Sequence, residues 1–247
     1  MTAIISARDL GVRFTRGGRS GGRLRELFIH RRDRTPRTTD FWPLRHLDFD
    51  IEPGEAVGVL GSNGTGKSTL LRLITGVLIP DEGHVTRRGG VAPLIALSAG
   101  FADDLTGREN VEMVAGLHGM SRKTLRAAFD EIVDFAEVAD FIDTPMRHYS
   151  SGMRVRLGFA VITRLDHPIL LVDEALAVGD TRFRRKCHAV IEAMLAEGKT
   201  LVLVSHNDTD LTRFCTRGLY LDAGRLRVDG TIADALAAYH ALAAATP

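Results

Sequence analysis

The chain lacks any apolar run long enough to cross a bilayer. Its apolar stretches, such as residues 91–102 and 168–172, fall far short of the roughly 20 residues that a membrane-spanning helix needs. The amino terminus has no basic region followed by an apolar run and a small-residue cleavage site, so it does not predict a secretory signal. Cysteine is scarce, and Cys187 and Cys215 form no C-x-x-C pair, which argues against a disulfide framework and a zinc site. We therefore expect a cytosolic location.

The remaining composition is that of an ordinary globular protein. Apolar residues make up 45% and charged residues 26% of the 247 residues, which fits one large domain over 1–247. The net charge of +1 conceals a basic patch, because residues 13–37 contain nine arginines against Glu26 and Asp33. Such a patch fits a solvated arm as well as a contact surface for anionic lipid or a partner.

The first part of the chain predicts strands interrupted by an insertion. A strand over 3–14 is followed by a Gly- and Arg-rich insertion over 15–41, within which residues 24–30 can form an amphipathic helix. Strand-and-turn patterning resumes after it, so we expect a small N-terminal antiparallel β portion.

The rest of the chain predicts helices and buried strands. From about 104 to 165 helical patterns dominate, with capping-box spacing between Thr106 and Glu109 and a second helix over 122–141. These predict an inserted helical lobe. Beyond it, apolar strands alternate with helices, which predicts an α/β fold with a mainly parallel sheet covered on both faces. An Ala-rich helix over 232–245 closes the chain.

The segment GSNGTGKS follows an apolar strand and opens a helix, as a phosphate-binding G-x-x-x-x-G-K-[ST] loop requires. Its glycines let backbone N–H groups close around phosphate oxygens, and the helix N-terminus adds a favourable dipole. Lys67 is expected to reach the β- and γ-phosphates, and the Ser68 hydroxyl to coordinate Mg²⁺. A tight glycine turn with a solvated lysine is the alternative. The expected nucleotide-binding residues here are Gly61, Ser62, Asn63, Gly64, Thr65, Gly66, Lys67, Ser68 and Thr69.

Two later strands end in polar residues. ILLVDE ends in Asp173, expected to hold Mg²⁺, and Glu174, expected to deprotonate the attacking water. VLVSH ends in His206, which we expect beside the γ-phosphate because ligand sites lie at the carboxyl ends of parallel strands. A helix cap for the acids and a structural role for the histidine are the alternatives. Lys67, Glu174 and His206 are thus the catalytic candidates.

The segment YSSGM, residues 149–153, precedes a helix and starts 24 residues before Asp173. A Ser/Gly-rich helix start is a second anion site. Since the phosphate loop already covers one side of the nucleotide, a second site suggests that a second subunit closes over it. An ordinary serine N-cap would explain Ser150 or Ser151 but not this order of motifs.

Together, the phosphate loop, YSSGM, ILLVDE followed by ALAVGD, and His206 resemble the nucleotide-binding subunits of ABC transporters over almost the whole chain. FADDLTGREN, LLVDEALAVGD and the basic insertion are more particularly similar to the ATPases of bacterial exporters of O-antigen, capsule, teichoic acid and galactan. The resemblance implies an ATP hydrolase that uses ATP and Mg²⁺, forms a homodimer and binds no nucleic acid. It also implies a separate integral-membrane permease, to which this chain would bind at the cytoplasmic face of the cell membrane, with 15–41 as a peripheral membrane contact.

The resemblance further implies roles for single residues. Ser150 and Gly152 would contact the γ-phosphate bound by the opposite subunit, and Asp180 would end a turn that crosses the dimer interface. Phe14 takes the place of the aromatic residue that stacks on adenine. A strand residue facing the core is the alternative interpretation of Phe14.

Two departures from the family pattern stand out. The family signature usually reads leucine, serine, glycine, glycine, glutamine, whereas Tyr149, Ser151 and Met153 replace its first, third and fifth residues. The chain also contains no glutamine. The glutamine that touches Mg²⁺ in most relatives therefore has no counterpart in LIALSAGFADDL, and no residue is assigned to that role.

Other classes of nucleotide-binding protein fit the sequence less well. A GTPase needs an N-K-x-D element, and Asn63, Asn110 and Asn207 are not followed by lysine. DNA-repair relatives place a long coiled coil between the phosphate loop and the signature, whereas only 81 residues separate Lys67 from Tyr149. A nucleotide-gated regulator without turnover and an exporter of a drug or a lipid are the other interpretations.

Overall fold

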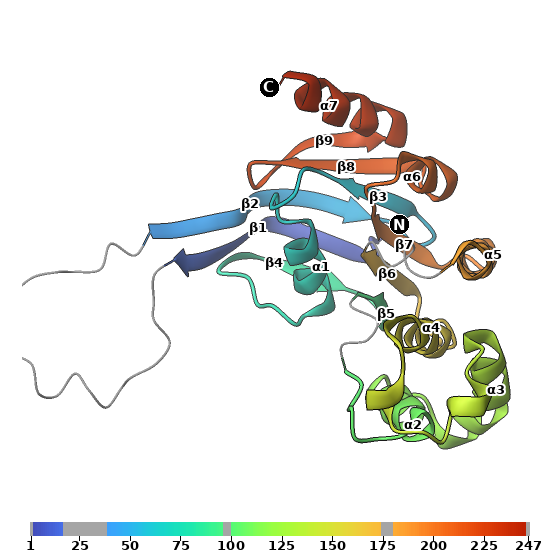
Figure 1. Ribbon diagram of the computed structural model, residues 1–247. Helices are drawn as coiled ribbons and strands as arrows, with labels where there is room; N and C mark the ends of the chain where they lie inside the picture. The colour runs from blue at the N-terminus through green and yellow to red at the C-terminus, as the bar shows by residue number, and fades with distance from the viewer. Residues whose placement is uncertain (1, 17–38, 96–99, 174–179, 246–247) are drawn as a thin grey trace, which may run out of the picture.

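A computed structural model describes residues 2–16, 39–95, 100–173 and 180–245 of the chain (Figure 1). The amino-terminal part forms an antiparallel sheet with strand order β2-β1-β4. Its strands are β1 (Ile5–Arg16), β2 (Thr39–Ile51) and β4 (Glu82–Arg87). This sheet is the small antiparallel portion that the sequence predicts.

A larger sheet of six strands has the order β5-β6-β7-β3-β8-β9. Its neighbours pair in parallel, except for the antiparallel hairpin of β8 and β9. The predicted α/β fold with a mainly parallel sheet is therefore confirmed. The strands are β3 (Ala56–Leu60), β5 (Val91–Leu94), β6 (Ile169–Asp173), β7 (Thr200–Val204), β8 (Arg217–Asp222) and β9 (Arg225–Thr231).

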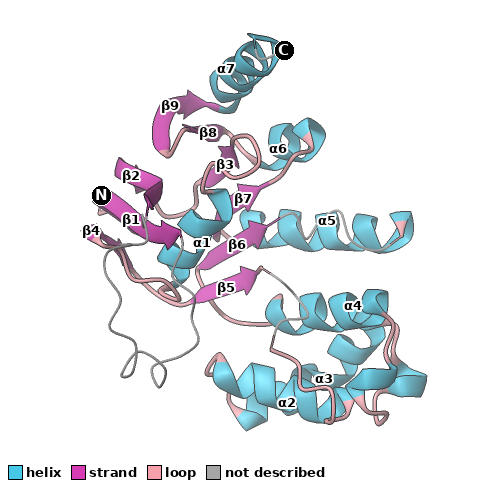
Figure 2. Cartoon of the chain, turned by 60° about the vertical axis from the view of Figure 1, so that its left-hand side comes forward, coloured by secondary structure: helices cyan, strands magenta, loops and turns pink. Residues whose placement is uncertain are grey.

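Both faces of the larger sheet are covered, which explains its continuous apolar strands. Ile169 and Leu171 of β6 pack in one cluster with Leu70 of α1 and with the antiparallel sheet. Leu170 of β6 packs on the opposite face in a cluster with Phe183 of α5. Figure 2 shows the strands between β1, β2 and α1 on one side and α5 and α6 on the other. The covering helices are α1 (Lys67–Thr75), α5 (Thr181–Ala196), α6 (Asp208–Phe214) and α7 (Ile232–Ala245).

Three further helices form a lobe beside β5 (Figure 1). They are α2 (Gly107–Leu117), α3 (Arg122–Ala136) and α4 (Ser151–Ile162), with short 3₁₀ turns at Ala139–Phe141 and Met146–His148. Val111, Ile132 and Leu157 are fully buried in a separate apolar cluster that these helices share. The lobe therefore has apolar packing of its own in addition to its contact with the core.

Local signals in the sequence located several helix ends correctly. The capping box of Thr106 and Glu109 is present, and Gly76 ends α1 in the left-handed conformation. The helix predicted over 122–141 is too long, however, because α3 ends at Ala136. Glu137 turns the chain with φ of 57°, and its carboxylate accepts a hydrogen bond from Lys186 of α5. A tertiary ion pair thus stabilises a break that helical periodicity does not reveal.

The boundaries of the predicted insertion need correction. Thr15 and Arg16 extend β1, and residues 39–41 begin β2, with Thr15 paired to Asp40. Residues 17–38, including the predicted amphipathic helix, lie outside the described part of the chain. Within the described ranges, no helix is long and apolar enough to cross a bilayer.

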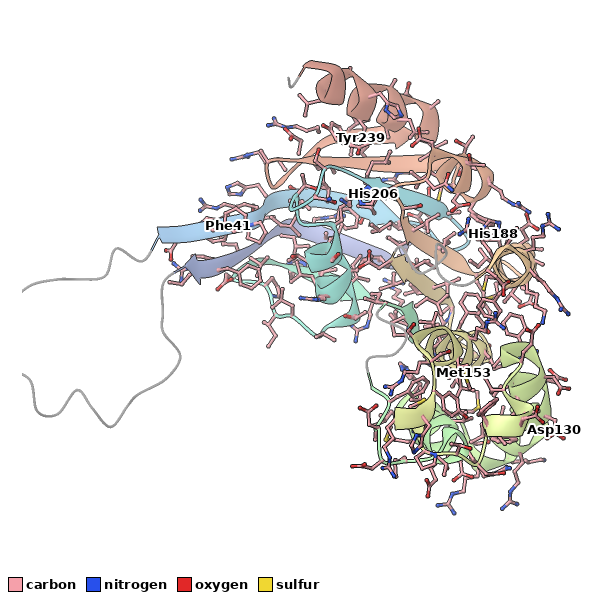
Figure 3. The ribbon with its side chains drawn as sticks, viewed as in Figure 1. Phe41, Asp130, Met153, His188, His206 and Tyr239 are labelled. Carbon is pink, nitrogen blue, oxygen red and sulfur yellow. The ribbon has the colours of Figure 1, made fainter. Side chains whose placement is uncertain are left out.

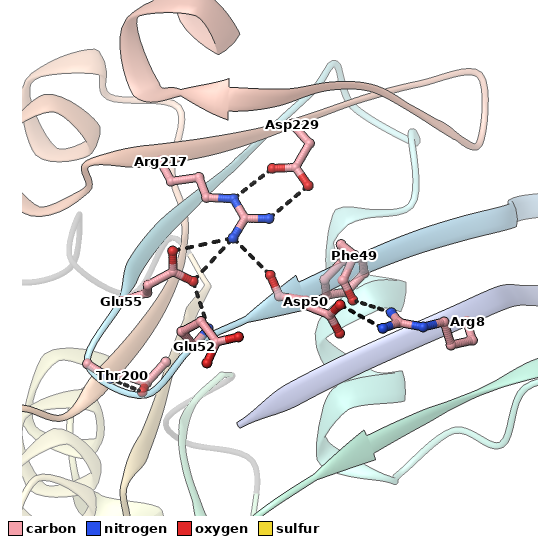
Figure 4. A network of polar contacts seen from close by, with 9 residues as sticks. Arg8, Phe49, Asp50, Glu52, Glu55, Thr200, Arg217 and Asp229 are labelled. Carbon is pink, nitrogen blue, oxygen red and sulfur yellow. Dashed lines mark hydrogen bonds and ion pairs between the residues drawn. The ribbon is translucent and has the colours of Figure 1, made fainter. Parts of the chain in front are cut away.

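Arg217 joins the two sheets through a cluster of polar contacts (Figure 4). From the start of β8 its guanidinium donates two hydrogen bonds to Asp229 of β9, at 2.6 and 2.8 Å. It also donates to the carbonyl oxygen of Asp50 in β2 at 2.8 Å and to Glu55 at 3.2 Å. These hydrogen bonds let one cation tie the end of the smaller sheet to the edge of the larger one. The Arg217 side chain is only 24% exposed, so the cluster is largely shielded from water.

Candidate functional site

The carboxyl ends of three neighbouring parallel strands form one edge of the larger sheet. Val59 of β3 pairs with Val204 of β7, and Val204 pairs with Asp173 of β6. The phosphate loop follows β3 directly, and His206 lies exposed two residues beyond β7. The sheet therefore brings the predicted phosphate loop, Asp173 and His206 to the same edge, where parallel sheets bind ligands.

The phosphate loop has a backbone that suits an anion. Gly66 has φ of 100°, and a Cβ atom there would lie 2.6 Å from the carbonyl oxygen of Pro43, so only glycine fits. Gly66 also caps α1 without a side-chain hydrogen bond, which leaves the first N–H groups of the helix without a side-chain acceptor at the cap. Lys67 is buried, and its Nζ donates to the carbonyl oxygens of Gly61 at 2.6 Å and Ser62 at 3.0 Å. The ammonium group is therefore held over the loop, where phosphate oxygens could replace these carbonyl partners.

A cavity of about 270 Å³ opens beside this loop. Its wall on the antiparallel sheet consists of Phe14 of β1 and Phe41 and Pro43 of β2. Phe14 is 42% exposed, so it does not occupy the core position that was the alternative for it. The opposite wall is formed by Asn63, Gly64, Gly66, Lys67, Ser68 and Thr69.

Phe41 was not identified from the sequence. Phe14 and Phe41 are direct cross-strand partners, although 26 residues lie between them in the chain. The sequence does show an aromatic residue near each end of the insertion. Whether these two residues lie together depends on the register of β1 with β2, which the sequence does not reveal.

The YSSGM segment lies on the helical lobe. Ser150 caps α4, and its Oγ accepts a hydrogen bond from the N–H of Met153 at 3.2 Å. Tyr149 is buried, its hydroxyl donates to the carbonyl oxygen of Phe141 at 2.7 Å, and burial raises its pKa to about 12. Tyr149 therefore serves as a core residue of the lobe. Figure 3 shows Met153 well away from Phe41 and His206, so the structure does not bring this segment to the phosphate loop of its own chain.

A family model described as ABC transporter matches residues 44–177. The chain belongs to the ABC transporter family. ATP is accordingly the nucleotide of this cassette.

Relatives of this ABC chain include proteins of export systems. The ABC transporter protein AbcA of Aeromonas salmonicida is 44% identical over 82% of this chain and 66% of its own length. The O-antigen export system ATP-binding protein RfbB of Klebsiella pneumoniae is 40% identical over 85% and 87%. The teichoic acids export ATP-binding protein TagH of Listeria monocytogenes is 41% identical over 80% and 59%. The chain thus spans most of RfbB but less than two thirds of AbcA and TagH.

Solved structures share the fold of the ABC cassette. A dimeric ATP-binding cassette in a post-hydrolysis state with ADP and phosphate superposes with a TM-score of 0.73 at 22% identity, covering 92% of this chain and 98% of that one. An ATP-binding subunit of an ABC transporter gives 0.75 at 20% identity, covering 94% and 91%. These similarities establish the fold of the ABC cassette for this chain.

Two residues at the strand-end edge, Ser68 and Asp173, suit a hard cation that a bound nucleotide would also help to hold. Ser68 lies exposed in the first turn of α1, and Asp173 is half-buried at the end of β6. Within the described ranges, no group of three His, Cys, Asp or Glu side chains could hold a metal ion alone. One hydroxyl and one carboxylate fit Mg²⁺, which commonly takes one or two protein oxygens together with substrate phosphates and water.

Two predicted elements of the family pattern, Glu174 and the ALAVGD segment, directly follow β6 in the chain. Glu174 and the turn through residue 179 lie outside the described part of the chain. Asp180 follows this turn and caps α5 by accepting a hydrogen bond from the N–H of Phe183 at 2.8 Å. That backbone hydrogen bond lowers the pKa of Asp180, and the nearby Arg156 lowers it further. Asp180 is thus ionised at neutral pH.

Proposed function

We propose that this chain is the ATP-hydrolysing subunit of an ABC exporter. The observation that carries this proposal is the alignment of the ends of β3, β6 and β7, which gathers the phosphate loop, Asp173 and His206 at one edge. Hydrolysis of the γ-phosphate depends mainly on positioning and charge neutralisation. Lys67 would neutralise phosphate charge, His206 would donate to the γ-phosphate, and Glu174 would accept the proton of the attacking water.

Ser68 and Asp173 would hold Mg²⁺ in this proposal. The bound ion supplies neutralisation of charge on the phosphate oxygens. The Ser68 hydroxyl oxygen and the Asp173 carboxylate would hold it at the strand-end edge.

A homodimer completes the proposed site. Among the described residues, a Cβ atom at Gly152 would meet only Ser150 Oγ within 4 Å, at 3.9 Å, so packing in the described part of the chain does not demand glycine there. A glycine helix start with open space can admit close approach by the phosphates of another subunit. Ser150 and Gly152 of one chain would therefore bind the γ-phosphate held by the phosphate loop of the other.

The cargo we propose is a lipid-linked polysaccharide of the O-antigen, galactan or teichoic-acid type. Its support is the identity of 40–41% with proteins named for export of O-antigen and teichoic acids. Export would require a separate integral-membrane permease, which places the chain at the cytoplasmic face of the membrane, with residues 17–38 between β1 and β2 as the contact to membrane or permease. The second candidate is an exporter of a drug or lipid. Cells without this chain should accumulate the lipid-linked polymer internally, whereas unchanged polymer at the surface would favour the second candidate.

Hydrolysis is tested by steady-state phosphate release with MgATP. Glu174→Gln should lower turnover about 10²- to 10⁴-fold, the range for loss of a general base, and should retain ATP in a dimer on size-exclusion chromatography. Glu197→Gln is the matched control, because Glu197 is exposed at the end of α5. A Glu174→Gln protein that stays monomeric and hydrolyses at the wild-type rate would refute the proposal.

A further inference from the structure

Asp210 of α6 is a buried carboxylate to which the proposed hydrolysis assigns no role. Four polar or charged side chains are buried in the described part of the chain: Lys67, Asn110, Thr200 and Asp210. Lys67 belongs to the phosphate loop, and Asn110 and Thr200 accept hydrogen bonds from backbone N–H groups. A buried carboxylate is costly unless a polar partner compensates it, so the partner of Asp210 deserves a closer description.

The partner of Asp210 is His188 of α5. His188 Nε2 lies 3.4 Å from Asp210 Oδ1, and the two side chains are 12% and 7% exposed. Nε2 makes no shorter polar contact within the described ranges. Burial lowers the pKa of His188, so the ring is neutral at pH 7 and its single N–H can point from Nε2 to the carboxylate. The same ring packs edge to face with Phe214 of α6, with centroids 5.2 Å apart.

Apolar packing alone leaves α6 more than one position. The helix has only seven residues, of which Leu211 and Phe214 are buried in the cluster that it shares with α5. Apolar contacts have no preferred direction, so they resist lifting of the helix more than rotation or sliding. A polar contact requires a particular distance and direction. The contact of Asp210 with His188 therefore selects one position of α6 on α5.

The connection between β7 and α6 transmits this position to His206. Only residues 205–207 separate the two elements. Ser205 Oγ accepts a hydrogen bond from the N–H of Asn207 at 3.0 Å, and Asn207 Oδ1 accepts one from the N–H of Thr209 at 2.9 Å. Because the connection is short and hydrogen-bonded to itself and to the first turn of α6, His206 must move when the start of α6 moves.

We propose that Asp210 is a positioning residue that holds His206 at the strand-end edge through its contact with His188. Figure 3 shows His188 well apart from His206, so the effect passes through α6 and not through direct contact. The inference rests on the proposed function, since it assumes that His206 takes part in hydrolysis. It adds two residues to that function without giving either of them a contact with the nucleotide.

Two variants break the contact from opposite sides. Asp210→Ala removes the carboxylate, and His188→Leu removes the ring nitrogen but keeps apolar volume. In each, turnover of MgATP should fall about 5- to 50-fold, because misplacement of reacting groups by about 1 Å can cost 10²-fold. The Kd for MgADP, measured by calorimetry, should stay within about twofold of wild type. Unchanged turnover in both variants would overturn the inference.

Two further variants are expected to retain turnover. Asp210→Asn keeps an acceptor oxygen for His188 and should hydrolyse within about twofold of the wild-type rate. Glu192→Gln is the matched control, because the Glu192–Arg213 pair joins the same two helices but is about half exposed and should matter little. A loss in Glu192→Gln equal to that in Asp210→Ala would contradict a specific role for the buried contact.

A comparison with His206→Ala separates positioning from general damage. In that background, Asp210→Ala should cause no further loss of single-turnover phosphate release, because its effect passes through His206. The full loss in both backgrounds would overturn the inference. The second readout is the His206 ring signal in an NMR spectrum of histidine-labelled protein with MgADP, identified by its absence in His206→Ala. This signal should shift in Asp210→Ala, and an unchanged signal would also overturn the inference. A wild-type chain that releases no phosphate would instead refute the proposed function, while the His206 signal still tests the position of His206.

Discussion

Arg156 of α4 donates a hydrogen bond to the carboxylate of Asp180, the residue that caps α5, over 2.5 Å. The same guanidinium donates to Glu137, at the end of α3, over 2.9 Å. Glu137 in turn binds Lys186 of α5. The helix that Ser150 caps, α4, is thus tied to α5, whose cap Asp180 directly follows residues 174–179 in the chain. We expect this network to transmit movement of the lobe to the proposed catalytic edge.

Replacing Arg156 should therefore impair turnover more than nucleotide binding. Arg156→Ala leaves the Lys67 loop intact, so the Kd for MgATP should stay within about threefold of wild type. Turnover should fall about 10-fold or more, because misplacement of reacting groups by about 1 Å can cost 10²-fold. Phosphate release and calorimetry measure the two effects. Arg154→Ala is the matched control, since Arg154 lies on the same helix but binds Asp103 within the lobe, and it should retain wild-type turnover.

In the proposed dimer, each nucleotide lies between the phosphate loop of one chain and the YSSGM segment of the other. Mixing variants separates these two contributions. Lys67→Ala removes the phosphate contact of one chain, and Ser150→Arg blocks the helix start that would serve the other chain. Each homodimer should be inactive, while the mixed dimer keeps one intact site and should recover up to about half of the wild-type activity per intact dimer. Heterodimers that form but release no phosphate would rule out a site shared between chains.

The Arg217 cluster should contribute measurably to stability. Arg217→Ala leaves Asp229 and Glu55 without their shared cation and should lower the free energy of unfolding by about 1–3 kcal/mol. Urea unfolding followed by circular dichroism measures it. Arg8→Ala is the control from the same region (Figure 4), because the Arg8–Asp50 pair is about half exposed and should matter less. Equal effects of the two variants would contradict a special role for Arg217.

Acid should destabilise the fold through its paired carboxylates. The hydrogen bond from Lys186 lowers the pKa of Glu137, and that from Arg45 lowers the pKa of Glu82. A carboxylate with a lower pKa in the folded state stabilises the protein above its unfolded pKa of about 4.3. This contribution is lost as the pH falls through the folded pKa. The urea midpoint should therefore drop between about pH 5 and pH 3, and Glu137→Gln should flatten that decline.

Features that depend on adjacent residues could be predicted from the sequence. The phosphate loop, the capping box at Thr106 and the helix end at Gly76 each consist of residues that act on their own backbone. Their position and chemistry are therefore readable without the fold. The α/β class followed from the alternation of apolar strands with helices, because burial on both faces requires apolar residues at every strand position.

Features that depend on distant partners could not be predicted in this way. Glu137 lies at the end of α3, where Lys186 and Arg156 bind its carboxylate. Phe41 belongs to the cavity because β2 pairs with β1 in one particular register. Periodicity carries no information about such pairings, since many registers and strand orders bury the same apolar residues. The packing of the sheets and the lobe selects one of them by satisfying charges and hydrogen bonds between segments far apart in the chain.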